Sequence, residues 1–347
     1  MPEQRCYVGL DVSLEQTSIC VVDDAGAVVW RGKRSSTADG IAAAVGKHAP
    51  GVVRIGLETG LLSTWLFHSL KELGLPVICL DARHAKAALS LRVNKTDAND
   101  AHGIAQIIRV GWYREVAVKS MDNHALRAML SARAQLVAQT VTVANTIRGL
   151  LRVFGLVVRK AKGRRFEALV RAAIIDQPPA LAAIIEPLLA VLAATREQLA
   201  GYERMVRRHA RSDQVARRLM TVPGVGTVVA LAFVTTIEDP ARFRRSSSVG
   251  AYLGLTPRHY QSGEVDRAGR ISRCGDAMLR SYLFEAANAL LRRSTRPCPL
   301  HSWGRGLIDR IGGRKAVVAV ARKLAVLLHS MWRNGADFRF AETVAAA

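Results

Sequence analysis

The sequence is poor in acidic and aromatic residues and has no paired cysteines. Among 347 residues, 28 Asp and Glu stand against 50 Lys and Arg, and aromatic residues make up 5%. None of the five cysteines forms a Cys-x-x-Cys pair, which argues against a zinc site or a disulfide framework and agrees with a reducing compartment. The start lacks a charged residue followed by a long apolar run, so we expect no signal peptide.

No segment is both apolar and long enough to cross a bilayer comfortably. The most apolar stretch, residues 179–195, is short and contains Glu186 and Pro187. A membrane span needs about 20 apolar residues. We therefore expect a cytoplasmic protein that is not inserted in a membrane.

The positive charge is large and uneven. The formal net charge is +22, and residues 201–340 carry 25 Lys and Arg against 10 Asp and Glu, leaving 25 against 18 elsewhere. Most of these C-terminal cations are Arg, which binds phosphate in a bidentate manner. Nucleic acid is the first partner that this charge favours, and an anionic membrane surface is the second. A generally basic, Arg-rich proteome is the simpler alternative.

The N-terminal part has the pattern of a mixed α/β layer. Half of the residues are hydrophobic, so the chain is not disordered, and its length suits about two domains. Strands that form a meander and then alternate with helices indicate a mixed sheet flanked by helices. The predicted strands are 6–12, 17–23, 27–32, 52–58 and 76–81, and the predicted helices are 39–49, 62–73, 82–91 and 96–110.

The rest of the chain is predicted to be mostly helical. Apolar residues at spacings of three and four over 123–154 and 181–206 predict two long helices, joined through the basic stretch 159–165. They suit an antiparallel hairpin or coiled coil, although Arg133 and Thr140 interrupt the seam and ordinary core helices fit as well. An Arg- and Gly-rich region follows and ends in an amphipathic helix, 315–332. We place the domain boundaries at 1–115, 116–212 and 213–347.

Four acidic residues have the placement of a metal site. Asp11 and Glu58 each end a predicted strand, where sites gather in open sheets. Asp97 and Asp100 lie three residues apart on one helix face. If that helix crosses the strand ends, four carboxylates converge and favour Mg²⁺ (or Mn²⁺), with two ions able to clamp a phosphate. Taken singly, each acid also fits a strand end, a helix cap or a surface position.

His102 lies near the acidic pair and is a candidate fifth ligand, although a structural role is simpler. Further along, residues 222–230 (VPGVGTVVA) have the shape of a helix-hairpin-helix phosphate clamp. Gly224 and Gly226 would permit a tight turn whose N–H groups face a phosphate. The alternative is a plain Gly-rich turn between helices.

Ser262 is a candidate nucleophile. We expect it in a loop ringed by Arg258, Arg267, Arg270 and Arg273. A serine hydroxyl needs a base, a metal or nearby positive charge to attack a phosphodiester. His259 is a candidate base, and a polar loop serine with a structural His259 is the simpler interpretation.

Several of these segments together resemble the IS110 family of insertion-sequence transposases. The resemblance runs in order over about residues 6–340, and its most specific parts are NKTDANDA and GLTPRHYQSG. The segments are GLDVS at 9–13, GLETG at 56–60, NKTDANDAHGIA at 94–105, VPGVGTVVA at 222–230, YLGLTPRHYQSG at 252–263 and GRISRCGDAMLR at 269–280.

The resemblance implies a ribonuclease-H-like (RuvC-like) N-terminal domain in which Asp11, Glu58, Asp97 and Asp100 bind the metal. It implies that Ser262 forms a covalent link to DNA. The helical middle would form a dimer, with a tetramer as the functional complex and each active site shared between subunits. A noncoding bridge RNA would pair with target and donor DNA. The resemblance also implies a bacterial protein associated with the nucleoid.

Three other readings of the sequence stay open. One is a water-using RuvC-like junction nuclease in which Ser262 is only structural. Another is a sugar kinase or other actin-fold ATPase, for which convincing phosphate and adenosine loops are lacking. The third is a non-enzymatic nucleic-acid-binding protein, which would tolerate loss of all four acids.

Overall fold

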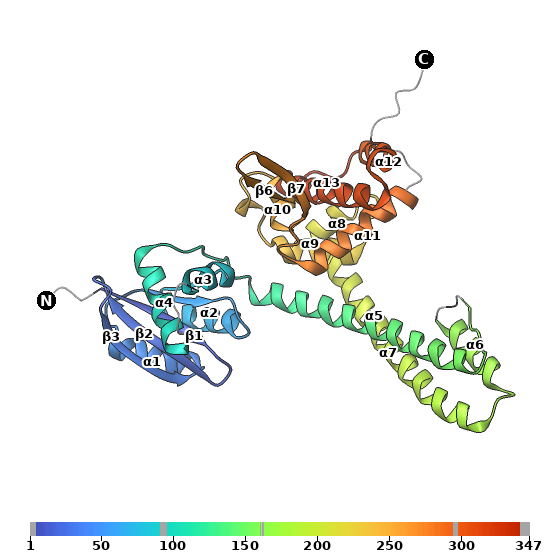
Figure 1. The fold of residues 1–347 in the computed structure, drawn as a ribbon, viewed down its shortest axis with the longest axis horizontal. Coiled ribbons are helices and arrows are strands. Elements are labelled where there is room, and N and C mark those ends of the chain that lie inside the picture. The colour runs from blue at the N-terminus through green and yellow to red at the C-terminus, as the bar shows by residue number, and fades with distance from the viewer. Residues whose placement is uncertain (1–4, 91–95, 160, 162, 294–297, 341–347) are drawn as a thin grey trace, which may run out of the picture. The chain divides into compact units, whose positions relative to one another are not determined.

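A computed structural model of the chain describes residues 5–90, 96–159, 161, 163–293 and 298–340. The chain divides into two compact units, Met1–Ser120 and Met121–Ala347 (Figure 1). The finer division at 116 and 213 stays a prediction.

The first unit is built on a five-stranded mixed sheet. Its order is β3-β2-β1-β4-β5, with β1 antiparallel to β2, β2 antiparallel to β3, and both β1–β4 and β4–β5 parallel. This confirms the expected meander followed by parallel strands. The strands are β1 (Cys6–Val12), β2 (Gln16–Asp23), β3 (Val28–Ser35), β4 (Val52–Glu58) and β5 (Val77–Leu80).

Helices cover both faces of this sheet because β1 is apolar on both. Val8 and Leu10 pack in a core with residues of α1 and α2. Tyr7 packs in a second core with residues of α4. Side chains alternate along a strand, so odd-numbered positions of β1 face α4. The helices are α1 (Ala38–His48), α2 (Ser63–Glu72), α3 (Ala82–Leu89) and α4 (Asp97–Val110).

Two long helices, α5 (Met121–Val153) and α7 (Pro179–Ser212), form a hairpin at the start of the second unit. They run antiparallel, since the end of α5 shares a core with the start of α7, and Arg133 near the start of α5 pairs with Glu203 at 3.0 Å. The helix pair is therefore confirmed, and Arg133 has a partner on α7. A coiled coil stays a prediction.

The connection between these helices contains a helix that the sequence patterns did not predict, α6 (Arg164–Ile174). Its buried residues Phe166, Val170 and Ile174 recur every four residues, as in an amphipathic helix. Part of the predicted basic connection, at residues 160 and 162, lies outside the described residues.

Six further α-helices, one 3-10 helix and one β-hairpin make up the remaining described residues of the second unit. The region is mostly helical, as expected, and the hairpin takes the place of the loop expected around Ser262. The elements are α8 (Gln214–Leu219), α9 (Thr227–Ile237), the 3-10 helix η1 (Pro240–Arg242), α10 (Ser248–Tyr252), β6 (Pro257–Ser262), β7 (Val265–Ile271), α11 (Ala277–Arg293), α12 (Pro299–Ile311) and α13 (Gly313–Asn334).

Within the described part of the chain, α7 alone has the length and composition to cross a membrane, with mean hydropathy 1.5 over its most apolar 18 residues. The expectation that this segment is too short was wrong, because the helix continues to Ser212. Leu181, Ile185 and Leu192 are buried against α5 and α6. A core helix has the same property, so this finding is weak evidence for a membrane.

Candidate active site

Asp11 and Glu58 occupy matching positions on neighbouring parallel strands. In the register of β1 and β4, Gly9 lies beside Gly56 and Leu10 beside Leu57. Asp11 and Glu58 come next in chain direction, at the carboxyl ends of the two strands. Because side chains alternate, Asp11 projects from the same face as Gly9, and Glu58 from the same face as Gly56.

The two glycines show that this face is the one covered by α4. A Cβ on Gly9 would lie 2.0 Å from the carbonyl oxygen of Ala101 and 2.5 Å from the amide nitrogen of Ala105. A Cβ on Gly56 would lie 2.8 Å from a methyl of Ile108. Only glycine permits so close an approach of helix and strand. Asp11 and Glu58 therefore project from the α4 side of the sheet.

Helix α4 brings the other two acids to the same edge. Asp97 and Asp100 lie in its first turn, where the Thr96 hydroxyl caps the helix by accepting from the amide of Asn99 at 3.2 Å. At the far end of α4, Arg109 donates to the carbonyl of Asp24 at 2.9 Å, beside the start of β1. The helix thus runs against β1 and begins at the carboxyl end of that strand. Asn94 and Lys95 of the same motif lie outside the described residues.

The carboxylates have the chemistry of a divalent-cation site, and a cation already binds one of them. The Lys33 ammonium donates to Asp97 at 3.1 Å, and both side chains are more than half exposed. They line a groove of about 650 Å³ together with Glu15 and Leu61. Among the residues described, no three His, Cys, Asp or Glu side chains form a group that could hold a metal ion. Carboxylate oxygens are nevertheless the ligands that Mg²⁺ prefers.

Other polar residues around the sheet have structural roles. Gln106 bonds His102 at 3.1 Å and the carbonyl of Gly26 at 2.7 Å, and so fixes α4 to the turn after β2. Burial, together with the negative charges of Glu115 and Glu58, raises the pKa of the Cys79 thiol to about 11. Cys79 is therefore a protonated, unreactive thiol at neutral pH.

Ser262 lies at the end of strand β6, so the expectation that it lies in a loop was wrong. It pairs with Val265 across a two-residue turn that starts at Gly263, whose φ is +57°. A positive φ at the first turn position is what a type II′ hairpin turn requires. All residues of β6 are exposed, and Ser262 is presented to solvent near the hairpin tip.

The hairpin does not surround Ser262 with all four predicted arginines. Arg267 pairs with Tyr260 and its guanidinium lies 5.8 Å from that ring, on the same face as Ser262 by strand alternation. His259 falls on the opposite face, with its Nδ1 3.8 Å from Asp266 Oδ1, and Arg270 lies where the register of the two strands shifts, between Ala268 and Ile271. His259 therefore does not face Ser262 as a base would.

The two remaining arginines lie toward the base of the hairpin. Arg258 donates to the carbonyl of Ser272 at 3.1 Å. Arg273 follows β7 with a left-handed backbone, φ +57°. Both are exposed and near the strand ends, so they are placed to contact a polyanion along the hairpin stem.

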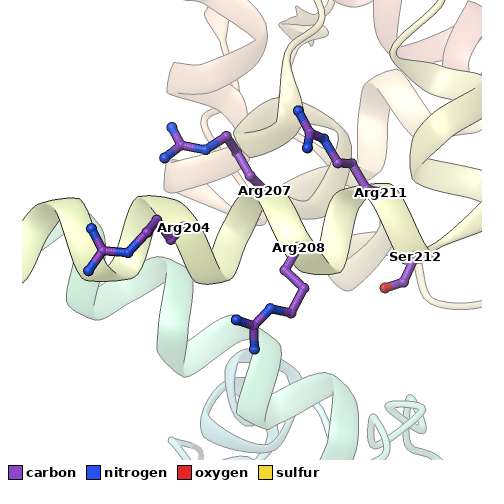
Figure 2. A pocket seen from close by; sticks show the side chains of 5 residues that line it. All are labelled: Arg204, Arg207, Arg208, Arg211 and Ser212. Atoms are coloured by element: carbon purple, nitrogen blue, oxygen red, sulfur yellow. The ribbon is translucent and has the colours of Figure 1, made fainter.

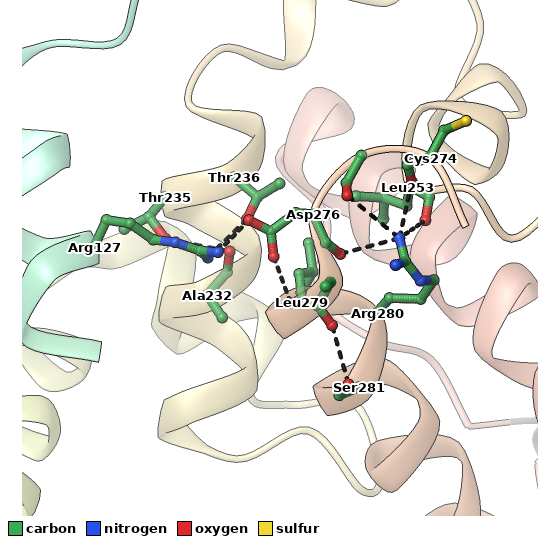
Figure 3. A network of polar contacts seen from close by, with 12 residues as sticks. Arg127, Ala232, Thr235, Thr236, Leu253, Cys274, Asp276, Leu279, Arg280 and Ser281 are labelled. Carbon is green, nitrogen blue, oxygen red and sulfur yellow. Dashed lines mark hydrogen bonds and ion pairs between the residues drawn. The ribbon is translucent and has the colours of Figure 1, made fainter. Parts of the chain in front are cut away.

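A polar network fixes the segment that follows the hairpin (Figure 3). One guanidinium nitrogen of Arg280 donates to the carbonyls of Leu253, at 3.0 Å, and Cys274, at 2.8 Å. Asp276 caps α11 by accepting from Leu279 at 2.6 Å and forms an ion pair with Arg127 of α5. Sequence reasoning did not assign these residues a role, although both Asp276 and Arg280 lie within the segment 269–280.

The glycines of the VPGVG turn have different surroundings. Gly224 has φ +85°, and a Cβ there would lie 2.4 Å from the carbonyl oxygen of Ala286 in α11. Both the backbone conformation and the close packing against α11 therefore require glycine at position 224. Gly226 precedes α9 with no atom within 4 Å of an added Cβ. The turn joins α8 to α9, and phosphate binding there stays a prediction.

Comparison with known proteins identifies the class of enzyme. Residues 8–155 match the DEDD transposase family of IS110, and residues 216–299 match the transposase IS116/IS110/IS902 family. The protein is therefore a transposase, an enzyme class that acts on DNA by strand cleavage and transfer. The DEDD match, with the mixed sheet, suggests the ribonuclease-H-like fold.

Individual relatives extend the similarity over most of the chain. The chain is 28% identical over 342 residues to the transposase for insertion sequence element IS1111A of Coxiella burnetii, covering 96% of this chain and 91% of that protein. It is 30% identical over 275 residues to a probable family 20 transposase of Pseudomonas aeruginosa, covering 78% and 81%. The chain belongs to the IS110 family of insertion-sequence transposases.

A further relative is named for a different reaction. The pilin gene-inverting protein of Moraxella lacunata is 28% identical over 134 residues, covering 35% of this chain and 38% of that protein.

Proposed function

We propose that this transposase cuts and rejoins DNA with Ser262 as nucleophile and with a Mg²⁺ (or Mn²⁺) site formed by Asp11, Glu58, Asp97 and Asp100. The observation that carries the proposal is the placement of the acids. Two lie side by side at strand ends on the face covered by α4, and two lie in the first turn of that helix. An acidic edge of this kind suits a divalent cation and a DNA phosphate.

A bound divalent cation would supply Lewis-acid polarisation of the phosphate and charge neutralisation. The chain's own residues provide the rest of the arrangement. Strands β1 and β4 hold Asp11 and Glu58 rigidly, and the capped start of α4 holds Asp97 and Asp100. Lys33 must release Asp97 when that carboxylate takes a metal ligand role, and is then free to bind a phosphate oxygen.

The serine step conserves the number of phosphoester bonds. The Ser262 oxygen forms a bond to phosphorus and loses its proton to solvent, while the bond from phosphorus to one deoxyribose oxygen breaks and leaves a free DNA hydroxyl. A hydroxyl of the incoming strand then attacks the phosphoserine and releases Ser262. Rejoining therefore needs no ATP. Arg267, on the same hairpin face, is placed to stabilise the added negative charge.

The proposed partners are donor and target DNA, a noncoding bridge RNA and further copies of the chain. The +22 charge supports binding of two nucleic acids. Exposed apolar residues on the long helices, among them Val141, Ile184 and Val191, support association of copies into a dimer and then a tetramer. In that assembly the acids of one subunit and Ser262 of another would form one site. Inversion of a gene, the reaction for which the Moraxella lacunata relative is named, also cuts and rejoins DNA.

The test is a search for a covalent protein–DNA adduct. The protein is incubated with Mg²⁺, the element's RNA and labelled donor and target DNA, then run on a denaturing gel. We expect an adduct that is lost in Ser262→Ala and in EDTA, and that falls at least about 100-fold in Asp97→Asn, because both charge stabilisation and the nucleophile are needed. Ser302→Ala, at another exposed serine on α12, is the matched control.

The alternatives give different gels. Cleaved DNA without an adduct, unchanged by Ser262→Ala, would indicate a water-using nuclease confined to the four acids. Binding with no cleavage, unchanged by all four acid substitutions, would indicate a non-enzymatic nucleic-acid-binding protein. An adduct formed without RNA would refute only the guidance by a bridge RNA and would leave the proposed chemistry standing.

A further inference from the structure

The C-terminal part of α7 carries a stripe of arginines that the proposed active site does not use. The α7 stripe consists of Arg204, Arg207, Arg208 and Arg211, which line a hollow of about 510 Å³ together with Ser212. Their spacings of three, one and three residues keep them on one helix face. Figure 2 shows their guanidinium groups spreading outward from a single stretch of the helix.

None of these four side chains forms an ion pair or hydrogen bond with another described residue. Arginines elsewhere around α7 are paired: Arg133 with Glu203, Arg171 with Glu186 and Arg196 with Glu167. Like charges three or four residues apart cost a helix about 0.2–0.5 kcal/mol per pair. The nearby helix C-terminus offsets part of that cost. The stripe is therefore a concentration of unneutralised cations.

The other side of the same helix segment is firmly held. Val206 and Ala210 are buried in the main core of the second unit, while all four arginines are exposed. The stripe thus sits on a rigid element. Its seven-residue rise spans about 10 Å, close to the rise of three nucleotides of one strand along the axis of duplex DNA, at about 3.4 Å each.

We infer that the α7 stripe binds the phosphate backbone of duplex DNA, outside the cutting site. The inference rests on the proposed function, because DNA is the substrate of that reaction. Guanidinium groups suit phosphate oxygens, and the lining, four arginines and a serine, has no acidic group. Contacts to phosphate position a duplex without reading its sequence. The stripe would therefore hold the DNA duplex in place, while the Ser262 hairpin and the four acids act on another part of the DNA.

The test compares the salt dependence of DNA binding in two variants with equal charge loss. The first is Arg204→Gln, Arg207→Gln, Arg208→Gln and Arg211→Gln together. The matched control removes four other exposed cations from α12 and α13, by Arg305→Gln, Arg310→Gln, Arg314→Gln and Lys315→Gln. Affinity for a labelled duplex of unrelated sequence is measured by fluorescence anisotropy between 50 and 200 mM salt, with circular dichroism to check folding.

Each lost phosphate contact flattens the slope of log affinity against log salt by about 0.9. We expect the α7 variant to flatten it by about 2 to 4, and the control by less than 1. Two double variants, Arg204→Gln with Arg208→Gln and Arg207→Gln with Arg211→Gln, keep the test valid if the fourfold variant unfolds. Each should flatten the slope by about 1 to 2.

Equal slopes in the α7 variant and its control would overturn the inference, because binding would then follow net charge alone. Weaker binding of duplex RNA with unchanged binding of duplex DNA would also overturn it. Failure of the proposed function looks different. A wild-type protein that binds DNA through the α7 stripe but forms no Ser262 adduct refutes the chemistry and keeps the inference.

Discussion

At the scale of single residues, Arg273 combines an unfavourable backbone with a position beside the serine hairpin. Its φ is +57°, and among the described non-glycine residues only Glu238 also has a positive φ. Its N–H donates to the carbonyl of Gly254 at 3.1 Å, which holds the conformation. A left-handed backbone costs an L-residue about 1–2 kcal/mol.

Replacing Arg273 by glycine should stabilise the fold. We expect Arg273→Gly to raise the free energy of unfolding by about 0.5–1 kcal/mol, because relief of strain exceeds the greater freedom of glycine in the unfolded chain. Denaturant unfolding measures the change. The control is Arg270→Gly in extended β7, which should lower it by about 0.5–1 kcal/mol. If Arg273→Gly lowered the free energy of unfolding as much as Arg270→Gly does, the backbone at Arg273 would not be strained.

A second residue, His329 of α13, makes the stability of the second unit depend on pH. Its ring is fully buried, with Nε2 donating to the carbonyl of Pro240 at 3.0 Å and Nδ1 accepting from the Ser246 hydroxyl at 2.9 Å. Burial lowers the pKa of His329, and the positive charge of Arg333 lowers it further. The hydrogen bond to Pro240 opposes these effects, but the pKa stays below its ordinary value. Below the ordinary pKa near 6.5, the unfolded chain binds the proton more readily.

The free energy of unfolding should therefore fall as the pH drops from 7 to 5, and unfolding in denaturant at several pH values measures it. The variant His329→Gln keeps a donor and an acceptor without titrating. We expect it to be less stable at pH 7 but flatter across this window. Parallel curves for the two proteins would assign the pH dependence to other groups.

At the scale of elements, the contact between α4 and β1 places the acids. Asp97 and Asp100 reach the sheet edge because Gly9 lets the helix backbone lie almost on the strand. We expect Gly9→Ala to destabilise the first unit by about 3 kcal/mol or more, because an added methyl meets backbone atoms that cannot rotate away. Thermal unfolding measures this change.

The control for this prediction is Gly46→Ala on α1, where an added Cβ meets nothing within 4 Å. There alanine should stabilise by about 0.5–1 kcal/mol through its better helix propensity. If both substitutions had the same sign, the close packing of α4 on β1 would be wrong.

The serine is held by a weaker kind of element than the acids. A two-stranded hairpin is marginally stable by itself, and β6 has no buried residue. Its base is held by the carbonyl bonds of Arg280 and the ion pair of Asp276. The acids therefore lie on the sheet and on the helix packed against it, while Ser262 lies on an element whose position depends on contacts at its base.

At the scale of the whole molecule, charge divides between the two units. Residues 1–120 carry 14 Lys and Arg against 12 Asp and Glu, a net +2, and residues 121–347 carry 36 against 16, a net +20. The proposed metal site thus lies in the nearly neutral unit, and the positive charge lies with Ser262 and the α7 stripe. Binding and metal chemistry are separated along the chain, so substitutions should affect one with little effect on the other.

The sequence by itself determined the elements of the first unit and the chain positions of its acids. The segments of β1 and β4 are mostly apolar, which predicts buried strands, and Asp11 and Glu58 come directly after an apolar residue near the end of each. These signals are local, because strand and helix periods appear within a few residues. The same locality explains why Asp97 and Asp100 were correctly placed at the start of a helix.

Only the tertiary structure decided which groups meet. The pairing of β1 with β4 and the crossing of α4 over Gly9 are contacts between distant segments, which no local pattern specifies. The hairpin around Ser262 was missed because its strands are exposed on both faces and so lack apolar alternation. Burial of Val206 and Ala210 shows which face of α7 is left to solvent, and the four arginines of the α7 stripe lie on that face. The sequence could not show this, because the burial of a helix face depends on contacts with segments that are distant in the chain.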